Sequence, residues 1–421
     1  MNFLFTLTGF IRMEVVIAEV LPSIKSCTIY GKCYQSFEGL KSIETEKSNC
    51  NFIFKDESRL EIIFPSGTSL VSNSVSGFNY DGSSVVLRAQ IDDKTILVDG
   101  LLTELINDVE DLKPYKNDFI HFKPDTEVCV TCRYCSTEIT DFVKFRRTCQ
   151  LPSVNWEHAS EDWFCCLEKP VKENLKPHSL QPNEDECFYA QLFYLLNKNN
   201  LAKEFVLKDN TVVCNECNFH IGDICQGNAK FWRHSIKWMD KSKNILYFQT
   251  ETESLISLFD NIDRDNFGVN CRLVLEKQSS PKEFIFMVTM NTNLKFLMSS
   301  NVFFGKKITS DFGRNGIEKD PIKEGNSIPI KKLCINSEDT SYNKTSISIE
   351  LNKYKVIKLL FKHKIGEDEE TGSWVDDINV HILPCGDRFF DTTLINLNNS
   401  NNLLPKQSNR IDDMLIGYVI R

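Results

Sequence analysis

Two Cys-x-x-Cys elements, separated by 78 residues, constrain the fold of this chain more than any other feature. They comprise Cys132 with Cys135 and Cys214 with Cys217. Each element places two thiols on one tight turn, and two such turns supply the four sulfurs of a tetrahedral zinc site. Because four thiolates leave no open position for water, we expect a structural zinc that staples two hairpins together.

Other interpretations of these cysteines stay open. A redox dithiol or a set of inert thiols has the same spacing. Ten of the 16 cysteines lie between positions 129 and 225. Cys129 and His220 are spaced to replace one of the four ligands, and Cys165 and Cys166 are further alternatives. We do not expect a disulfide framework, because residues 1–12 lack the features of a secretory signal and are interpreted as an upstream extension.

Length and charge limit the classes of partner. The 421 residues allow two or three domains with buried cores. The formal net charge of −9 argues against a direct nucleic-acid binder or an anionic-membrane binder, which need clustered Lys and Arg. Since no run of 18 apolar residues occurs, we expect no membrane-spanning helix. Protein partners are therefore favoured.

The hydrophobic pattern predicts a mainly β fold with minor α structure, as two β-rich domains with a zinc staple. Residues 13–125 are predicted to form an N-terminal β domain, residues 126–225 a Cys-rich zinc region, and residues 226–421 a C-terminal β-rich domain. Short β-branched and aromatic runs carry the N-terminal prediction; they are residues 51–54, 60–64, 84–88 and 95–98, followed by a helical pattern at 101–112.

Hairpins and loops complete the prediction. Residues 205–207 and 211–214 form one expected hairpin, which delivers Cys214 at a strand end, and residues 272–275 and 284–288 form a second. The later segments are an insertion loop at 308–331, strands at 346–351 and 354–363, an acidic loop at 367–370, a strand at 377–383 and an Asn-rich C-terminal stretch.

Two further cysteines draw attention. Cys187 follows an acidic run and precedes an aromatic segment; acidic neighbours raise the pKa of a thiol, so it is a poor nucleophile but could ligate a metal of another protein. Cys385 has His381, Asp387 and Arg388 nearby, although the strand-like pattern there does not place His381 on the same face.

The order of the motifs resembles the HECT-like ubiquitin-conjugating-enzyme-binding family, a ubiquitin-protein ligase group also linked to pre-mRNA 3′-end processing. Motifs within residues 126–225 carry the resemblance: Cys132-x-x-Cys135, Leu151-Pro152-Ser153-x-x-Trp156, Trp163-Phe164-Cys165-Cys166, Glu186-Cys187-Phe188, and Cys214-x-x-Cys217 with Gly222. A C-terminal segment from Leu383-Pro384-Cys385 to Val419 is similar to the HECT-like tail of the family.

The resemblance implies two activities from different classes. In the first, the protein binds a ubiquitin-conjugating enzyme and promotes ubiquitin transfer, with Cys385 as the candidate catalytic carrier of a thioester. In the second, it is a non-enzymatic adaptor that binds the metallo-β-lactamase-type endonuclease of cleavage and polyadenylation, with Cys187, Phe188 and Trp163 as partner-binding residues. A cytoplasmic and nuclear location follows from the same resemblance.

Overall fold

The computed structural model describes most of the chain. The described residues are 13–33, 39–92, 126–151, 181–190, 192–202, 206–208, 211–225, 227–265, 271–277, 280–299, 346–377 and 380–421. Strands predominate over helices among them, so the prediction of a mainly β fold is confirmed. No helix in these ranges is both long and apolar enough to cross a lipid bilayer.

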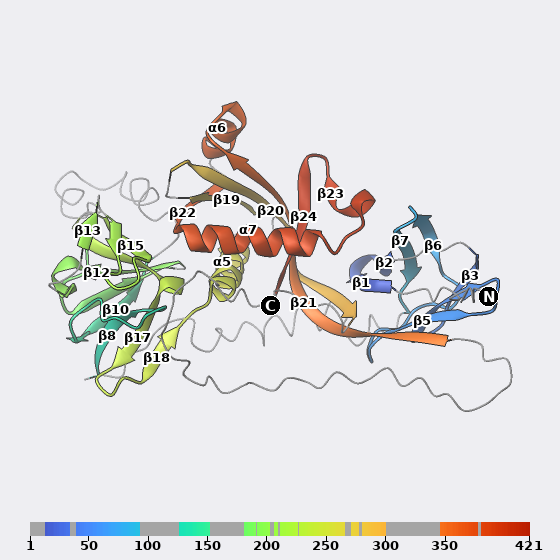
Figure 1. Ribbon diagram of the computed structural model, residues 1–421, viewed down its shortest axis with the longest axis horizontal. Helices are drawn as coiled ribbons and strands as arrows, with labels where there is room; N and C mark the ends of the chain where they lie inside the picture. The colour runs from blue at the N-terminus through green and yellow to red at the C-terminus, as the bar shows by residue number, and fades with distance from the viewer. Residues whose placement is uncertain are drawn as a thin grey trace, which may run out of the picture.

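The largest sheet contains 13 strands and joins the two ends of the sequence. Its central path runs β3-β4-β5-β21-β20-β1-β2-β7-β6 (Figure 1). The strands of this path are β1 (Met13–Leu21), β2 (Ser26–Cys33), β3 (Leu40–Thr45), β4 (Asn49–Phe54), β5 (Arg59–Ile63), β6 (Ser76–Tyr80), β7 (Ser84–Gln90), β20 (Glu283–Ser299) and β21 (Ser346–Ile365). A 3₁₀ turn, η1 (Pro22–Ile24), connects β1 and β2.

Strands β20 and β21 pair with each other and tie the N-terminal strands to the C-terminal part of the molecule (Figure 1). At one end, β21 pairs in parallel with β5, and β20 pairs antiparallel with β1. The buried core of the N-terminal strands accordingly includes Leu297 and Leu351 from this strand pair. The predicted N-terminal domain at 13–125 is therefore completed by C-terminal strands, a long-range pairing that local patterns do not reveal.

The other end of the strand pair carries a second core. Here β19 (Arg272–Lys277) pairs with β20, and β22 (Val380–Cys385) pairs with β19. Helices α5 (Glu251–Asp265) and α7 (Asp387–Asn401) contribute to this core with Leu258, Phe259, Phe389 and Leu397. The remaining elements are α6 (Glu369–Val375), η5 (Lys406–Ser408), β23 (Arg410–Ile411) and β24 (Met414–Ile420).

The described residues of the Cys-rich region, together with the strands that follow it up to Phe248, form two further sheets at one end of the molecule (Figure 1). The four-stranded sheet contains β18 (Ile245–Phe248), β17 (Ile236–Asp240), β8 (Glu127–Cys132) and β9 (Val143–Lys144). The seven-stranded sheet contains β10 (Arg147–Gln150), β11 (Glu186–Tyr189), β12 (Phe193–Asn197), β16 (Asn228–Trp232), β15 (His220–Cys225), β14 (Thr211–Val213) and β13 (Val206–Lys208). The 3₁₀ turns η3 (Lys198–Asn200) and η4 (Arg233–Ser235) connect strands of this region.

Strand pairing extends the Cys-rich region beyond its predicted end. Strand β16 pairs with β15 and β12, and β17 pairs with β8. The predicted boundary between residues 225 and 226 thus falls inside the β15–β16 hairpin. One core fills the space between the two sheets, where the Trp238 ring meets the rings of Tyr194 and Phe145 edge-on, with centroids 5.3 Å and 5.9 Å away.

Some predictions of individual hairpins, strands and loops agree with the structure, and others differ from it. The two predicted hairpins are confirmed as β13–β14 and β19–β20. The predicted strands at 346–351 and 354–363 are a single strand, β21. Asp368 accepts a hydrogen bond from the Thr371 N–H (3.0 Å) and caps α6, so the acidic stretch predicted as a loop begins a helix. The Asn-rich stretch contains α7. The predictions at 1–12, 95–98, 101–112 and 308–331 fall outside the described residues.

Candidate metal centre

The first thiol pair lies on a turn at the end of β8. The Ser136 N–H donates to the Cys132 carbonyl (2.9 Å), and the Cys132 N–H donates to the Thr137 carbonyl (2.8 Å). Ser136 has a left-handed φ of 62°, which a non-glycine residue rarely adopts. The turn therefore reverses the chain within the Cys-x-x-Cys spacing.

The second thiol pair repeats this geometry at the end of β14. The Asn218 N–H donates to the Cys214 carbonyl (2.8 Å), the Cys214 N–H donates to the Phe219 carbonyl (2.9 Å), and Asn218 has a φ of 54°. Two segments 78 residues apart thus adopt one backbone conformation. We call these two turns the knuckles.

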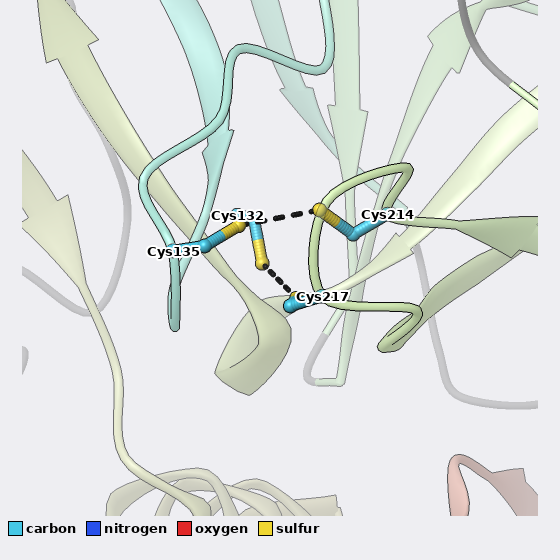
Figure 2. Close-up of side chains that lie close together, drawn as sticks. All are labelled: Cys132, Cys135, Cys214 and Cys217. Carbon is cyan, nitrogen blue, oxygen red and sulfur yellow. Dashed lines mark hydrogen bonds between the residues drawn. The ribbon is translucent and has the colours of Figure 1, made fainter. Parts of the chain in front are cut away.

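The knuckles bring their four sulfurs together (Figure 2). All four lie within 4.8 Å of one another; the Cys132 and Cys217 sulfurs are 3.6 Å apart, and those of Cys135 and Cys214 are 3.3 Å apart. Four bonds of about 2.3 Å in a tetrahedron would separate the sulfurs by roughly 3.8 Å. The cluster is therefore compatible with a structural zinc. Since β8 and β14 belong to different sheets, such an ion would join them.

Burial without a cation disfavours ionisation of two of these thiols. Burial raises the pKa of Cys132, and it raises the pKa of Cys217 to about 11. At Cys135 burial opposes ionisation, but hydrogen bonds from the Thr137 hydroxyl (3.1 Å) and backbone outweigh it and lower the pKa to about 7. A divalent cation would stabilise all four as thiolates, and four ligands would leave it closed to substrate.

The alternative ligands that the structure describes, Cys129 and His220, do not join the four-sulfur cluster. Cys129 precedes Cys132 by three positions in β8, so its side chain points to the opposite face of the strand. The His220 ring Nε2 already contacts the Gly222 carbonyl (2.8 Å) and an Asp223 carboxylate oxygen (3.0 Å). Residues 165 and 166 fall outside the described part of the chain. Among the described residues, the geometry thus favours the four cysteines of the knuckles.

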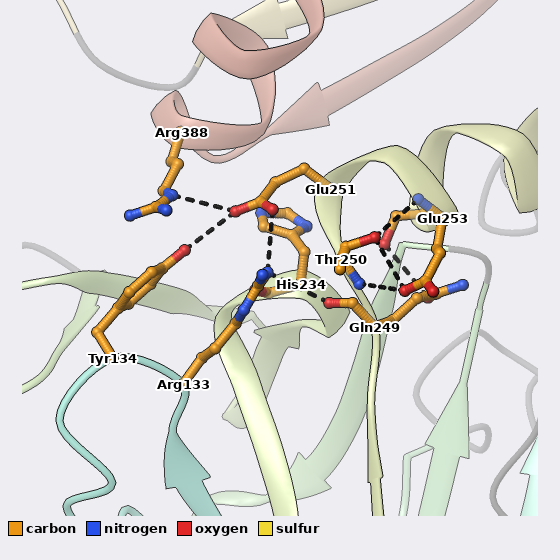
Figure 3. A network of polar contacts seen from close by, with 9 residues as sticks. Arg133, Tyr134, His234, Gln249, Thr250, Glu251, Glu253 and Arg388 are labelled. Atoms are coloured by element: carbon orange, nitrogen blue, oxygen red, sulfur yellow. Dashed lines mark hydrogen bonds and ion pairs between the residues drawn. The ribbon is translucent and has the colours of Figure 1, made fainter. Parts of the chain in front are cut away.

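A polar network connects the first knuckle to helices α5 and α7 (Figure 3). One carboxylate, that of Glu251, accepts from Arg133 Nη1 (3.0 Å), from the Tyr134 hydroxyl (3.0 Å) and from Arg388 Nε (3.1 Å). Burial opposes ionisation of Glu251, yet Arg133 and further positive neighbours hold the pKa of this carboxylate below its usual value. Glu251 begins α5 and Arg388 lies in the first turn of α7.

His234 lies beside this network with its ring stacked on Phe389, the centroids being 5.0 Å apart. Its side chain is buried, and its Nδ1 has no hydrogen-bond partner among the described atoms. Burial lowers the pKa of His234 to about 3. Glu251 opposes this shift, whereas nearby positive groups reinforce it; they are Arg133, Arg388 and His220. His234 is therefore neutral in the folded protein at physiological pH.

We expect His234 to weaken the fold as the pH falls. Because its pKa is lower in the folded than in the unfolded chain, its contribution is fully present above pH 6.5 and is lost progressively as the pH falls toward 3. Between pH 7 and pH 5 the loss is about 2 kcal/mol. The variant His234→Phe keeps a ring against Phe389 and should remove this part of the pH dependence. Urea unfolding of wild type and His234→Phe at pH 7 and pH 5 checks this prediction. If both proteins lose the same free energy of unfolding between the two pH values, the prediction is wrong.

The predicted partner-binding residues do not form an exposed surface where they are described. Cys187 and Phe188 are buried in β11, and burial raises the pKa of the Cys187 thiol. A thiol in this core cannot reach a metal of another protein unless β11 opens. Trp163 falls outside the described residues.

Cys385 does not meet the requirements of a thioester carrier. It ends strand β22 and is fully buried in the core formed with α5 and α7. Burial raises the pKa of its thiol, and the Asp387 carboxylate adds to the effect. A carrier thiol must be accessible and readily ionised. The sequence pattern around Cys385 does not reveal this burial, because the residues of α5, α7 and β19 that enclose the thiol come from distant parts of the chain or from the following helix.

Sequence reasoning missed the polar network around Glu251. Arg133 and Tyr134 stand inside the first Cys-x-x-Cys element, but nothing in their spacing points to Glu251 or Arg388. One signal was present in the sequence, the spacing of Thr250 and Glu253. In the structure the Glu253 carboxylate accepts from the Thr250 N–H (2.7 Å), and the Thr250 hydroxyl accepts from the Glu253 N–H (3.1 Å). This capping box marks the start of α5.

Comparisons with known proteins cover most of the chain. The family described as HECT-like Ubiquitin-conjugating enzyme (E2)-binding matches residues 19–415. The chain is 22% identical over 375 residues to an E3 ubiquitin-protein ligase of Mus musculus, covering 85% of each chain. It is 22% identical over 392 residues to the Homo sapiens protein of the same name, covering 85% of this chain and 86% of the relative. No solved structure matches.

Proposed function

The chain belongs to the HECT-like ubiquitin-conjugating enzyme (E2)-binding family, and from this premise we propose that it binds an E2 and promotes ubiquitin transfer. The observation that carries the proposal is the match of the family over residues 19–415, which includes both knuckles, α5, α7, β22 and β23. The relatives from mouse and human, which match over most of their length, are named as E3 ubiquitin-protein ligases, and this supports a role in ubiquitin transfer.

We further propose that the four cysteines of the knuckles bind a structural zinc. The support is their mutual distance and the repeated turn geometry. In this proposal the ion closes the Cys-rich region, and the E2 supplies the reactive thioester. The role of the chain is then to bind the E2 and to orient its thioester for attack by an acceptor amine.

Binding assays with a panel of purified E2 enzymes test this function. The full-length protein should bind at least one E2 and accelerate discharge of its ubiquitin onto free lysine. The proposal is refuted if the purified protein, with its native metal content, binds no member of the panel and accelerates no discharge.

Burial of Cys385 leads to a specific prediction for transfer. The variant Cys385→Ala should discharge ubiquitin from the E2 at a rate within about twofold of wild type, because a thiol enclosed by the core is not accessible to a donor thioester. Single-turnover discharge measures this rate, and thermal unfolding verifies that the variant is folded. A folded variant that loses transfer more than tenfold would restore Cys385 as the carrier.

The adaptor role for a cleavage endonuclease stays a prediction, as does the cytoplasmic and nuclear location. Among the described residues no specific observation favours the adaptor role, because Cys187 lies in the core of the Cys-rich region.

A further inference from the structure

Each knuckle contributes one aromatic ring to a shared pair. Tyr134 lies between the ligands Cys132 and Cys135, and Phe219 follows Cys217 by two positions. The two ring centroids are 4.3 Å apart at an interplanar angle of 55°. This contact requires the two knuckles to stay together, which is what an ion held by all four sulfurs would ensure.

The aromatic pair receives a cation from the C-terminal part of the molecule. The guanidinium carbon of Arg388 lies 4.0 Å from the ring centroid of Tyr134 and 5.7 Å from that of Phe219. Such cation–π contacts favour a defined position of the guanidinium over the rings. Arg388 thus connects α7 to both knuckles at once.

Glu251 holds the other side of the same arrangement. Its carboxylate binds Arg133 and Tyr134 of the first knuckle and Arg388 of α7, as Figure 3 shows. Its side chain is 9% exposed and that of Arg133 is 17% exposed, so solvent screens this pair only partly. Glu251 is the first residue of α5. Both helices therefore contact residues that lie between Cys132 and Cys135 in the first knuckle.

We propose that metal binding at the knuckles is thermodynamically coupled to the docking of α5 and α7 on the Cys-rich region. The metal fixes the positions of Tyr134 and Phe219, and these rings hold Arg388 and, through it, the first turn of α7. Coupling of this kind is reciprocal: if the metal favours docking, docking raises the affinity for the metal by the same factor. The inference rests on the proposed zinc site and is independent of E2 binding.

The variant Arg388→Ala tests the reciprocal effect, and the chain offers a matched control. Arg272 also pairs with a carboxylate, Asp377 (2.8 Å), and its guanidinium carbon lies 5.0 Å from the Trp374 ring centroid, but neither partner belongs to a knuckle. We expect Arg388→Ala to lower the zinc affinity of the full-length protein about five- to tenfold, and Arg272→Ala to change it less than twofold. Competition with a chromophoric zinc chelator measures both affinities.

Two further measurements make the test independent of a single variant. Glu251→Gln removes the shared negative charge and should also lower zinc affinity about fivefold. Hydrogen exchange at the first turns of α5 and α7 should be at least tenfold faster in chelator-treated than in zinc-loaded wild-type protein. A wild-type protein that binds zinc, with both variants at wild-type affinity and α7 exchange unaffected by the chelator, would overturn the coupling and leave the zinc site intact. A wild-type protein that binds no zinc would overturn both.

Discussion

A chelator that removes the proposed zinc is expected to unfold the Cys-rich region. Structural zinc contributes roughly 10–16 kcal/mol of apparent binding free energy in small zinc domains, which is comparable to the whole stability of a domain, about 5–15 kcal/mol. This region has its own apolar core, so we expect a loss smaller than the full zinc contribution, on the order of 5 kcal/mol or more. That loss should leave the region mostly unfolded at 37 °C.

Tryptophan fluorescence provides the measurement, because Trp238 and Trp232 are fully buried in this part of the chain. Cys132→Ser combined with Cys214→Ser should reproduce the effect of the chelator. Cys129→Ala is the control: this thiol is also buried in β8, but it lies on the face away from the knuckles. Folded protein that elemental analysis finds free of metal would contradict the prediction.

The sequence allows the four-cysteine cluster to be predicted because its signal is local. Two Cys-x-x-Cys elements suffice to suggest the ligands, and no other part of the fold has to be known. Choosing among the alternatives required the structure. Only the direction of side chains in β8 separates Cys129 from Cys132, and only the contacts of His220 show that it is engaged elsewhere.

Helix α7 was not predicted because its local and tertiary preferences conflict. Its sequence contains several Asn residues, which have low helix propensity. The buried positions nevertheless follow helical spacing, with Phe389, Thr393, Leu397 and Ser400 on one face. The packing of this face in the core outweighs the low helix propensity of the Asn residues. The same core contains Cys385, so the tertiary contacts that stabilise the helix also bury the thiol.

Pairing between distant segments explains the remaining differences. Strand β21 completes the N-terminal sheet, and β16 and β17 complete the Cys-rich region. Partners of a strand depend on the whole topology and not on its own residues. The contacts of Glu251 with Arg133 and Arg388 have the same origin, since each joins residues more than 100 positions apart.

The variant Gly222→Ala is expected to destabilise the Cys-rich region by about 3 kcal/mol or more. Gly222 lies in β15 opposite Phe231 of β16. A Cβ at this position would be 1.9 Å from the Lys230 carbonyl oxygen and 2.9 Å from the Phe231 Cα. Both atoms are backbone, so no side-chain rotation relieves the clash, and β15 would have to move away from β16.

Displacement of β15 should also weaken the metal site, because β15 pairs with β14, which positions Cys214. Gly372→Ala is the matched control: a Cβ there meets nothing within 4 Å, and alanine is favoured over glycine inside helix α6, so stability should be equal or higher by up to about 1 kcal/mol. Urea unfolding and zinc competition on both variants compare the two sites. If Gly222→Ala unfolds within about 1 kcal/mol of wild type and keeps its zinc affinity, the close approach of β15 and β16 is not required for the region to fold.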